Sequence, residues 1–179
     1  MSEKYKATAI GELYFITVTV IDWVDLLTRP VYKDVIIDSF KHCMDHKGLM
    51  LHAYVIMTNH FHAIVSSDND LAPIIRDLKK YTSKSLIAMI SEINESRRVW
   101  LLKKFAFAAD RVKKGVNYKI WQDGYHPVHL SSAKMVEQRL NYIHRNPVKE
   151  GYVYAPENYV YSSASAYCGL DSQLTLQML

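Results

Sequence analysis

The sequence predicts an α+β fold in which an antiparallel sheet carries helices packed on one face. Three observations lead to this prediction. The length of 179 residues fits one domain with a single core, and 49% hydrophobic and 22% charged residues are typical of a soluble globular protein. Strand-like and helix-like segments also follow one another in the order strand, helix, strand, strand, helix, strand, helix. We therefore expect residues 1–179 to form one domain.

The first half of the chain supplies most of the expected sheet. Runs of β-branched and aromatic residues predict buried strands at Leu13–Ile21, Leu51–Met57 and Phe61–Ser66, the last two joined by a tight turn at Thr58-Asn59. Between the first two strands, Pro30 is expected to open a helix that ends near Gly48. The stretch DNDLAPIIRDLKKYTSKSLIAMISEI, residues 68–93, spaces its apolar residues as an amphipathic helix does.

The second half is less regular. Residues 94–119 mix basic and apolar residues and are compatible with a helix, a flexible connection or both. A short strand is predicted at Pro127–Leu130. Ser131 or Ser132 can cap the N-terminus of the helix AKMVEQRLNYIHR, which Pro147 is expected to stop. The core order strand, helix, strand, strand, helix, strand matches a ferredoxin-like sheet.

Charge and cysteine content restrict the function classes only broadly. The net charge of +4 and the pI near 8.9 are compatible with a polyanionic partner. Cys43 and Cys168 form no CxxC pair or disulfide framework, which favours a reducing compartment. The N-terminal segment has no cleavage site typical of a signal peptide, and its apolar run LYFITVTVI is too short to span a membrane. We therefore expect a cytoplasmic protein with no membrane partner.

Two histidines lie in the stretch VIMTNHFHAIV, residues 55–65, at the start of the third predicted strand. Side chains of a strand alternate between its faces, so His60 and His62 share one face while Phe61 points to the other. Two neighbouring imidazoles can serve as paired metal ligands. They can equally be ordinary polar residues on a solvated face, and the pair alone does not decide between these interpretations.

A second stretch, LNYIHRNPVKEG, residues 140–151, offers chemistry that would complete such a site. Tyr142 and Asn146 are four residues apart, so they lie one turn from each other on the same face of a helix. Asn146 precedes Pro147 and is expected to close the helix, where a cation is favoured and an amide oxygen can bind a hard divalent ion. The phenol of Tyr142 is a nucleophile once it has lost its proton. If this helix packs beside the histidine strand, these groups can gather around one metal ion.

Together the motifs resemble a known family. His60-Phe61-His62 looks like the HUH motif of single-tyrosine transposases. The stretch YIHRNPVKEGYV, followed by PENYVYSSASAY, resembles the C-terminal signature of the REP-associated tyrosine transposases, and WQDGYHPV is similar to the same group. The resemblance runs from the first strand to about Gly169, with the motifs in the family's order. It implies an HUH endonuclease-like catalytic domain.

The resemblance also implies an activity, which is the metal-assisted nicking and rejoining of single-stranded, hairpin-ended DNA. In that family the tyrosine of the late helix attacks the DNA, which gives a 5′-phosphotyrosine bond and a free 3′-hydroxyl. By resemblance, the nucleophile is Tyr142, and the ligands of the divalent metal, Mg²⁺ or Mn²⁺, are His60, His62 and Asn146. Family members act as homodimers or alone, and the sequence is compatible with both.

Basic residues are the expected contacts to DNA. Arg145 and Lys149 lie beside the proposed site and are predicted to bind phosphate, as are Lys113 and Lys114. The last two belong to a basic run made up of Arg97, Arg98, Lys103, Lys104, Arg111, Lys113 and Lys114. Such a run is either a solvated face or a set of non-specific contacts to single-stranded or hairpin DNA. The sequence leaves both interpretations open.

Other residues and other functions are less favoured. Tyr81 lies among lysines that could lower the pKa of a phenol, but no ligand-type residue is spaced from it as Asn146 is from Tyr142. The remaining candidates lie in turns or on other faces, and they are Tyr118, Tyr125, His126, His129 and His144. Two alternative functions stay open: a protein that binds DNA hairpins without cutting them, and a metal-dependent nuclease that uses water.

Overall fold

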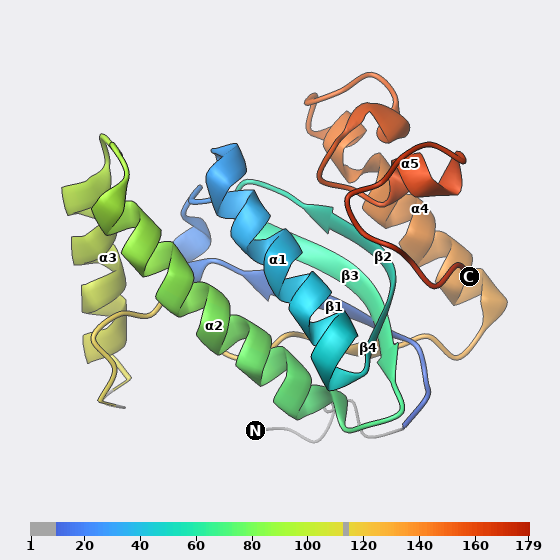
Figure 1. Ribbon diagram of the computed structural model, residues 1–179, viewed down its shortest axis with the longest axis horizontal. Coiled ribbons are helices and arrows are strands. Elements are labelled where there is room, and N and C mark those ends of the chain that lie inside the picture. The colour runs from blue at the N-terminus through green and yellow to red at the C-terminus, as the bar shows by residue number, and fades with distance from the viewer. Residues whose placement is uncertain (1–9, 113–114) are drawn as a thin grey trace.

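The chain folds around a four-stranded antiparallel sheet with the strand order β2-β3-β1-β4 (Figure 1). The computed structural model describes residues 10–112 and 115–179. The strands are β1 (Tyr14–Thr19), β2 (Leu49–Ile56), β3 (His60–Ser67) and β4 (Val128–His129). The helices are α1 (Pro30–Lys47), α2 (Leu71–Glu92), α3 (Arg98–Asp110), α4 (Ala133–Lys149) and α5 (Ala164–Tyr167), with short 3-10 turns η2 (Ile21–Trp23) and η3 (Pro156–Asn158). Within the described ranges, no helix is long and apolar enough to cross a bilayer. The arrangement confirms the predicted α+β fold with an antiparallel sheet.

Helices cover both faces of this sheet, because each strand alternates its side chains between two hydrophobic layers. Ile16 of β1 and Phe61 of β3 belong to the layer formed with α1 and α2, which lie side by side across the sheet in Figure 1. Phe15 and Ile64 belong to the second layer, where they pack with Ile143 of α4. The predicted arrangement, with helices on one face, describes α1 and α2 only. Helix α4 adds a second covered face.

The ends of the helices follow from local sequence. Pro30 occupies the first turn of α1, where a missing N–H leaves no hydrogen bond unmade. Gly48 ends this helix with a φ of 71°, a left-handed conformation that glycine adopts without strain. Asp70 caps α2 by accepting a hydrogen bond from the N–H two residues on, and Ser132 caps α4 by accepting one from the N–H three residues on. These boundaries agree with those predicted for α1 and for the start of α4.

The prediction that Pro147 stops α4 is wrong, because the helix continues to Lys149. A proline in the last turn removes only its own N–H, and the next N–H groups still find carbonyl acceptors. The N–H of Glu150 donates to the carbonyl of Asn146 at 3.0 Å, and Gly151, with a φ of 74°, then turns the chain away. Asn146 therefore does not close the helix. Its backbone carbonyl is paired, and its side-chain amide is the group that remains for a ligand.

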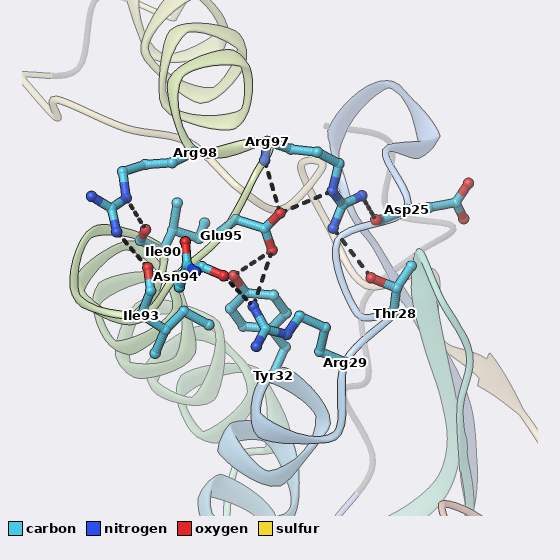
Figure 2. Close-up of polar contacts among 10 residues, drawn as sticks. All are labelled: Asp25, Thr28, Arg29, Tyr32, Ile90, Ile93, Asn94, Glu95, Arg97 and Arg98. Carbon is cyan, nitrogen blue, oxygen red and sulfur yellow. Dashed lines mark hydrogen bonds and ion pairs between the residues drawn. The ribbon is translucent and has the colours of Figure 1, made fainter.

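The segment that was undefined from sequence, residues 94–119, contains α3 and a buried carboxylate. Glu95 is 7% exposed and accepts a hydrogen bond from the hydroxyl of Tyr32 at 2.9 Å. It also accepts bonds from the backbone N–H of Arg97 at 3.0 Å and from its guanidinium at 3.2 Å, and the guanidinium of Arg29 lies 4.0 Å away. Figure 2 shows the carboxylate enclosed by these three side chains. The start of α1 is thereby tied to the loop before α3.

The two arginines at the start of the basic run hold the protein's own loops together. The guanidinium of Arg97 donates to the carbonyl of Asp25 at 2.7 Å and to the hydroxyl of Thr28 at 3.2 Å. That of Arg98 donates to the carbonyls of Ile90 and Ile93 at the end of α2 (Figure 2). Neither residue lies in a purely solvated face, and both have their hydrogen bonds within the chain. These two residues of the basic run therefore take part in the internal hydrogen bonding of the fold.

Hydrogen bonding keeps Glu95 ionised. Burial raises the pKa of this carboxyl, but the hydrogen bonds from Arg97 and Tyr32 and the charge of Arg97 outweigh burial and hold the pKa below its usual value. Burial, with the adjacent carboxylate of Glu95, raises the pKa of Tyr32 to about 12. Because the pKa of Glu95 is lower in the folded than in the unfolded protein, the ionised carboxylate stabilises the fold at every pH above the unfolded pKa. This stabilisation is lost as the pH falls through the folded pKa.

The C-terminal segment covers part of the outer edge of β2. Ser162 forms an antiparallel bridge with Val55. Further along, the N–H of Gln177 donates to the carbonyl of Leu51 at 3.0 Å, and a ring nitrogen of His52 lies 2.8 Å from the carbonyl of Gln177. At two places, therefore, outward-facing backbone groups of the edge strand β2 are paired with the C-terminal segment of the same chain.

Glu95→Gln should lower the free energy of unfolding at pH 7 by about 1–3 kcal/mol, the range for a buried hydrogen bond to a charged group. Because the wild-type contribution depends on the ionised carboxylate, the difference between the two proteins should shrink as the pH is lowered toward 3. Urea denaturation at several pH values measures both effects. Glu92→Gln, at an exposed position near the end of α2, is the matched control and should change stability by less than about 0.5 kcal/mol. A difference that stays constant with pH would contradict the prediction.

Candidate active site

The two histidines lie on the sheet face that α4 covers. Because β3 pairs with β1 in antiparallel register, His60 lies opposite Thr19 and His62 lies opposite Thr17. The centroids of the two imidazole rings are 4.6 Å apart. His62 is only 6% exposed, and His60 is half-buried. The shared face expected from strand alternation is present, but it is a covered face and not a solvated one.

Each imidazole is oriented through its Nδ1 atom. Nδ1 of His60 lies 2.6 Å from Oδ1 of Asn59, and since a carbonyl oxygen only accepts, Nδ1 carries the proton and Nε2 keeps its lone pair. Nδ1 of His62 lies 2.8 Å from the hydroxyl of Thr17. The side-chain amide of Asn59 in turn donates to the carboxylate of Asp25 at 3.0 Å, which connects His60 to the loop before α1. Outer contacts of this type fix the ring orientation of histidines that bind metals.

Burial keeps both imidazoles neutral. It lowers the pKa of His62 to about 3, with smaller contributions from His60 and from the charge of Arg139. Burial also lowers the pKa of His60, against an opposing effect of Glu150. A neutral imidazole with an unprotonated nitrogen is the form that binds a divalent cation, so the chemistry of the pair fits such an ion. Among the described residues, no group of three or more His, Cys, Asp and Glu side chains could hold a metal ion.

Tyr142 of α4 contacts His62, one member of the histidine pair, within the same chain. Its hydroxyl lies 3.4 Å from Nε2 of His62, and the two rings meet edge to face with centroids 5.1 Å apart. Phe15 of β1 stacks on His62 at 5.1 Å and meets the ring of Tyr142 edge to face at 6.0 Å. Tyr142 is nevertheless 42% exposed. The phenol therefore combines a fixed position beside an imidazole with access from outside the protein.

Asn146 and two predicted DNA contacts lie along the same stretch of α4. Asn146, Arg145 and Lys149 line a depression of about 190 Å³ together with Tyr142. Arg145 and Lys149 are exposed, whereas Asn146 is 8% exposed. The hydrogen bonds of the two imidazoles go to other residues. The structure thus brings the phenol into contact with His62 and leaves the amide one helical turn further along.

Three residues around the site were missed from sequence. Arg139 precedes Tyr142 by three positions, and its guanidinium lies 4.8 Å over the ring of Phe15. The helical spacing alone was enough to place Arg139 on the face of the nucleophile. Thr17 could not have been identified, because its contact depends on the register between two strands. Asn59 is adjacent to His60 in sequence, but nothing in the sequence indicates that its side chain turns back to the ring.

The rival candidates have other surroundings. Tyr81 is 57% exposed on α2, the helix that packs on the opposite face of the sheet. Nε2 of His144 lies 2.9 Å from the hydroxyl of Ser163, and burial lowers the pKa of His144 to about 4. His129 lies 3.0 Å from the carboxylate of Glu12. None of these contacts involves the histidine pair.

Several residues of the basic run have partners within the chain. Arg97 and Arg98 are committed to internal hydrogen bonds, and Lys104 pairs with a carboxylate of η2 at 2.8 Å. Lys113 and Lys114, which were predicted to bind DNA, lie outside the described residues. The basic residues that border the Tyr142 depression come from α4.

One protein family matches the chain. Residues 14–116 fit the family described as IS200-like transposases, a span that contains His60 and His62 and ends before α4. This span is more than half of the 179 residues. No curated protein matches the chain.

Two solved structures are also similar. The first is a REP-associated tyrosine transposase bound to a REP hairpin, with a TM-score of 0.61 and 21% identity over 100% of this chain and 94% of that chain. The second, from Deinococcus radiodurans R1 and provisionally assigned as a transposase, has a TM-score of 0.45 and 12% identity over 74% of this chain and 89% of that chain. The first structure supports the fold, and with the family match it confirms the resemblance drawn from the sequence motifs. The chain belongs to the IS200-like transposase family.

Proposed function

We propose that this protein nicks and rejoins single-stranded, hairpin-ended DNA with Tyr142 as the nucleophile. The observation that supports the proposal is the 3.4 Å distance between the Tyr142 hydroxyl and Nε2 of His62 in one chain. Two motifs that are 80 positions apart in sequence meet at this contact. Because tyrosine and histidines belong to the same chain, a single chain can carry the site whether or not a homodimer forms.

The proposed reaction is an exchange of phosphate esters. The phenolic oxygen of Tyr142 attacks the phosphorus of a DNA phosphodiester, and the bond from phosphorus to the 3′ oxygen breaks. The phenol's proton is transferred, through solvent, to the departing 3′ oxygen, so that a 5′-phosphotyrosine and a 3′-hydroxyl result. Rejoining is the reverse attack by a 3′-hydroxyl. The 42% exposure of Tyr142 supports this role, since a phosphodiester has to reach the hydroxyl.

His60, His62 and Asn146 are the residues that would hold a divalent cation, Mg²⁺ or Mn²⁺. Such an ion supplies polarisation of the phosphate and stabilises the charge that develops on it. In the tautomer whose Nδ1 donates to Thr17, Nε2 of His62 has one lone pair, which can serve either the phenol of Tyr142 or a cation. With a cation on Nε2 of His62, the hydroxyl of Tyr142 would be released from that contact and free to meet a phosphate. Asn146 is a buried residue one turn further along α4, and its side-chain amide oxygen is the proposed third ligand of the cation.

DNA is the proposed partner, and the basic residues of α4 are its proposed phosphate contacts. Arg145 and Lys149 border the depression that contains Tyr142, and Arg139 lies one turn before it. The similar structure with a TM-score of 0.61 is of a transposase bound to a REP hairpin, which supports a hairpin-ended substrate here. The same basic residues would also bind DNA in the alternative function, a protein that binds hairpins without cutting them.

Tyr142→Phe should abolish the covalent adduct between protein and DNA, because only the hydroxyl is removed. The measurement is a shift in denaturing gels after incubation with a single-stranded hairpin oligonucleotide and Mn²⁺. Tyr81→Phe is the matched control and should form the adduct as the wild type does. Cleavage without an adduct in Tyr142→Phe would favour the water-using nuclease, and wild-type binding without any cleavage would favour the hairpin-binding protein.

His60→Ala should reduce metal-dependent cleavage by at least about 100-fold, since the loss of one ligand leaves an incomplete site. DNA affinity measured in EDTA should stay within about threefold of the wild type, because the variant leaves every proposed phosphate-binding arginine and lysine in place. Cleavage at the wild-type rate would remove His60 from the metal site.

Asn59→Ala tests the orientation of His60 without removing a ligand. Loss of the Nδ1 partner should weaken the apparent affinity for Mn²⁺ by about 10- to 100-fold, as is usual for such outer contacts. The maximal cleavage rate at saturating Mn²⁺ should recover most of the wild-type value. A titration of cleavage against Mn²⁺ concentration measures both quantities, and an unchanged midpoint would contradict the prediction.

A further inference from the structure

We infer that Trp23 is a stacking platform for an unpaired base of the DNA strand that enters the Tyr142 site, an inference that rests on the proposed function. Trp23 is 60% exposed although it is the largest apolar side-chain type. Its indole meets the ring of His60 edge to face, with centroids 5.9 Å apart. An open aromatic surface therefore borders His60, one of the residues proposed to hold the cation.

The backbone of η2 presents this indole in an unusual conformation. Asp22 and Trp23 have φ values of 51° and 55°, in the left-handed region that side chains other than glycine rarely adopt. Contacts with the later part of the chain hold the conformation: the N–H of Ile21 donates to the carbonyl of Ile120 at 2.7 Å, and Asp22 pairs with Lys104 at 2.8 Å. Two neighbouring residues thus have an unusual backbone conformation next to a candidate site, and contacts with distant parts of the chain maintain it. Such a conformation points to a function for the side chain that it exposes.

The orientation of Trp23 is linked to that of the metal-site histidine. The side-chain amide of Asn59 lies 3.5 Å from the carbonyl of Trp23, and its oxygen accepts from Nδ1 of His60. One side chain thus contacts both the proposed ligand and the η2 backbone. A base stacked on the indole is positioned relative to His60 through the same contacts.

The charge around η2 favours a nucleic-acid strand as the occupant. The hydrogen bond from Lys104 and the charge of Arg111 lower the pKa of Asp22, which places two basic residues of the α3 region beside the loop. An exposed aromatic ring beside cationic side chains is the combination by which proteins bind single-stranded DNA, with bases on the ring and phosphates on the cations. This geometry supports stacking of one base on Trp23, with little preference for which base it is.

Binding can be tested separately from cleavage. The background protein is the full chain with Tyr142→Phe in EDTA, and the probe is a hairpin oligonucleotide with a single-stranded oligo(dT) flank on either side. An abasic residue is placed at each flank position in turn. We expect one or two positions at which loss of the base weakens binding by about 5- to 100-fold, the effect of one stacked base. Adding Trp23→Ala should weaken binding of the unmodified probe by a similar factor and remove the sensitivity to the abasic position.

Two further variants make the result specific. Trp23→Phe keeps an aromatic face and should retain most of the affinity and of the abasic sensitivity. Tyr81→Ala removes another exposed aromatic ring, on the helix that packs on the opposite face of the sheet, and should change affinity by less than about twofold. Unchanged affinity and unchanged abasic sensitivity in Trp23→Ala would overturn the inference, even if the wild type cleaves DNA. The expected Trp23 pattern in a protein that does not cleave would support stacking and refute the nucleophile.

Discussion

In the antiparallel pairing of β1 with β3, Thr17 lies opposite His62 and Thr19 lies opposite His60, and the rest of the site depends on this register. A slip of one residue would turn every side chain of a strand to the other face. His62 would then enter the layer under α1 and α2, where a polar ring has no partner, and Phe61 would leave it. The hydrophobic alternation that builds two cores therefore also fixes which face carries the imidazoles.

The position of the phenol depends on the docking of α4. Ile143 is fully buried against the sheet, and its neighbour Tyr142 therefore sits at the border between the packed face of the helix and its surroundings. Burial of an isoleucine side chain contributes about 1.5–3 kcal/mol, enough to fix the rotation of the helix. The continuation of α4 past Pro147 keeps Asn146 and Lys149 on the regular helical face that begins with Tyr142. The site is thus a product of one strand and one helix, each held by its own hydrophobic side.

Local sequence patterns were sufficient to predict much of this arrangement. The strands, the ends of α1 and the face shared by His60 and His62 follow from alternation, proline and glycine positions and strand geometry, all of which act over a few residues. The helical passage through Pro147, the internal role of Arg97 and the contact of Thr17 with His62 were not predictable in this way. The first depends on which nearby carbonyls accept from the N–H groups that follow the proline. The other two depend on contacts with residues distant in sequence.

The cover that the C-terminal segment gives to β2 has a consequence for self-association. A bare strand at the rim of a sheet offers a row of open donors and acceptors to any other extended chain, and this is the usual starting point of aggregation. Here Ser162 and Gln177 take up such groups on β2, while at the opposite rim β4 contributes only two residues, Val128 and His129. Another polypeptide could extend the sheet at β2 only after peeling this segment away. The β2 rim is therefore closed to a second copy of the chain that would add a strand there, and the register between β2 and β3 stays undisturbed.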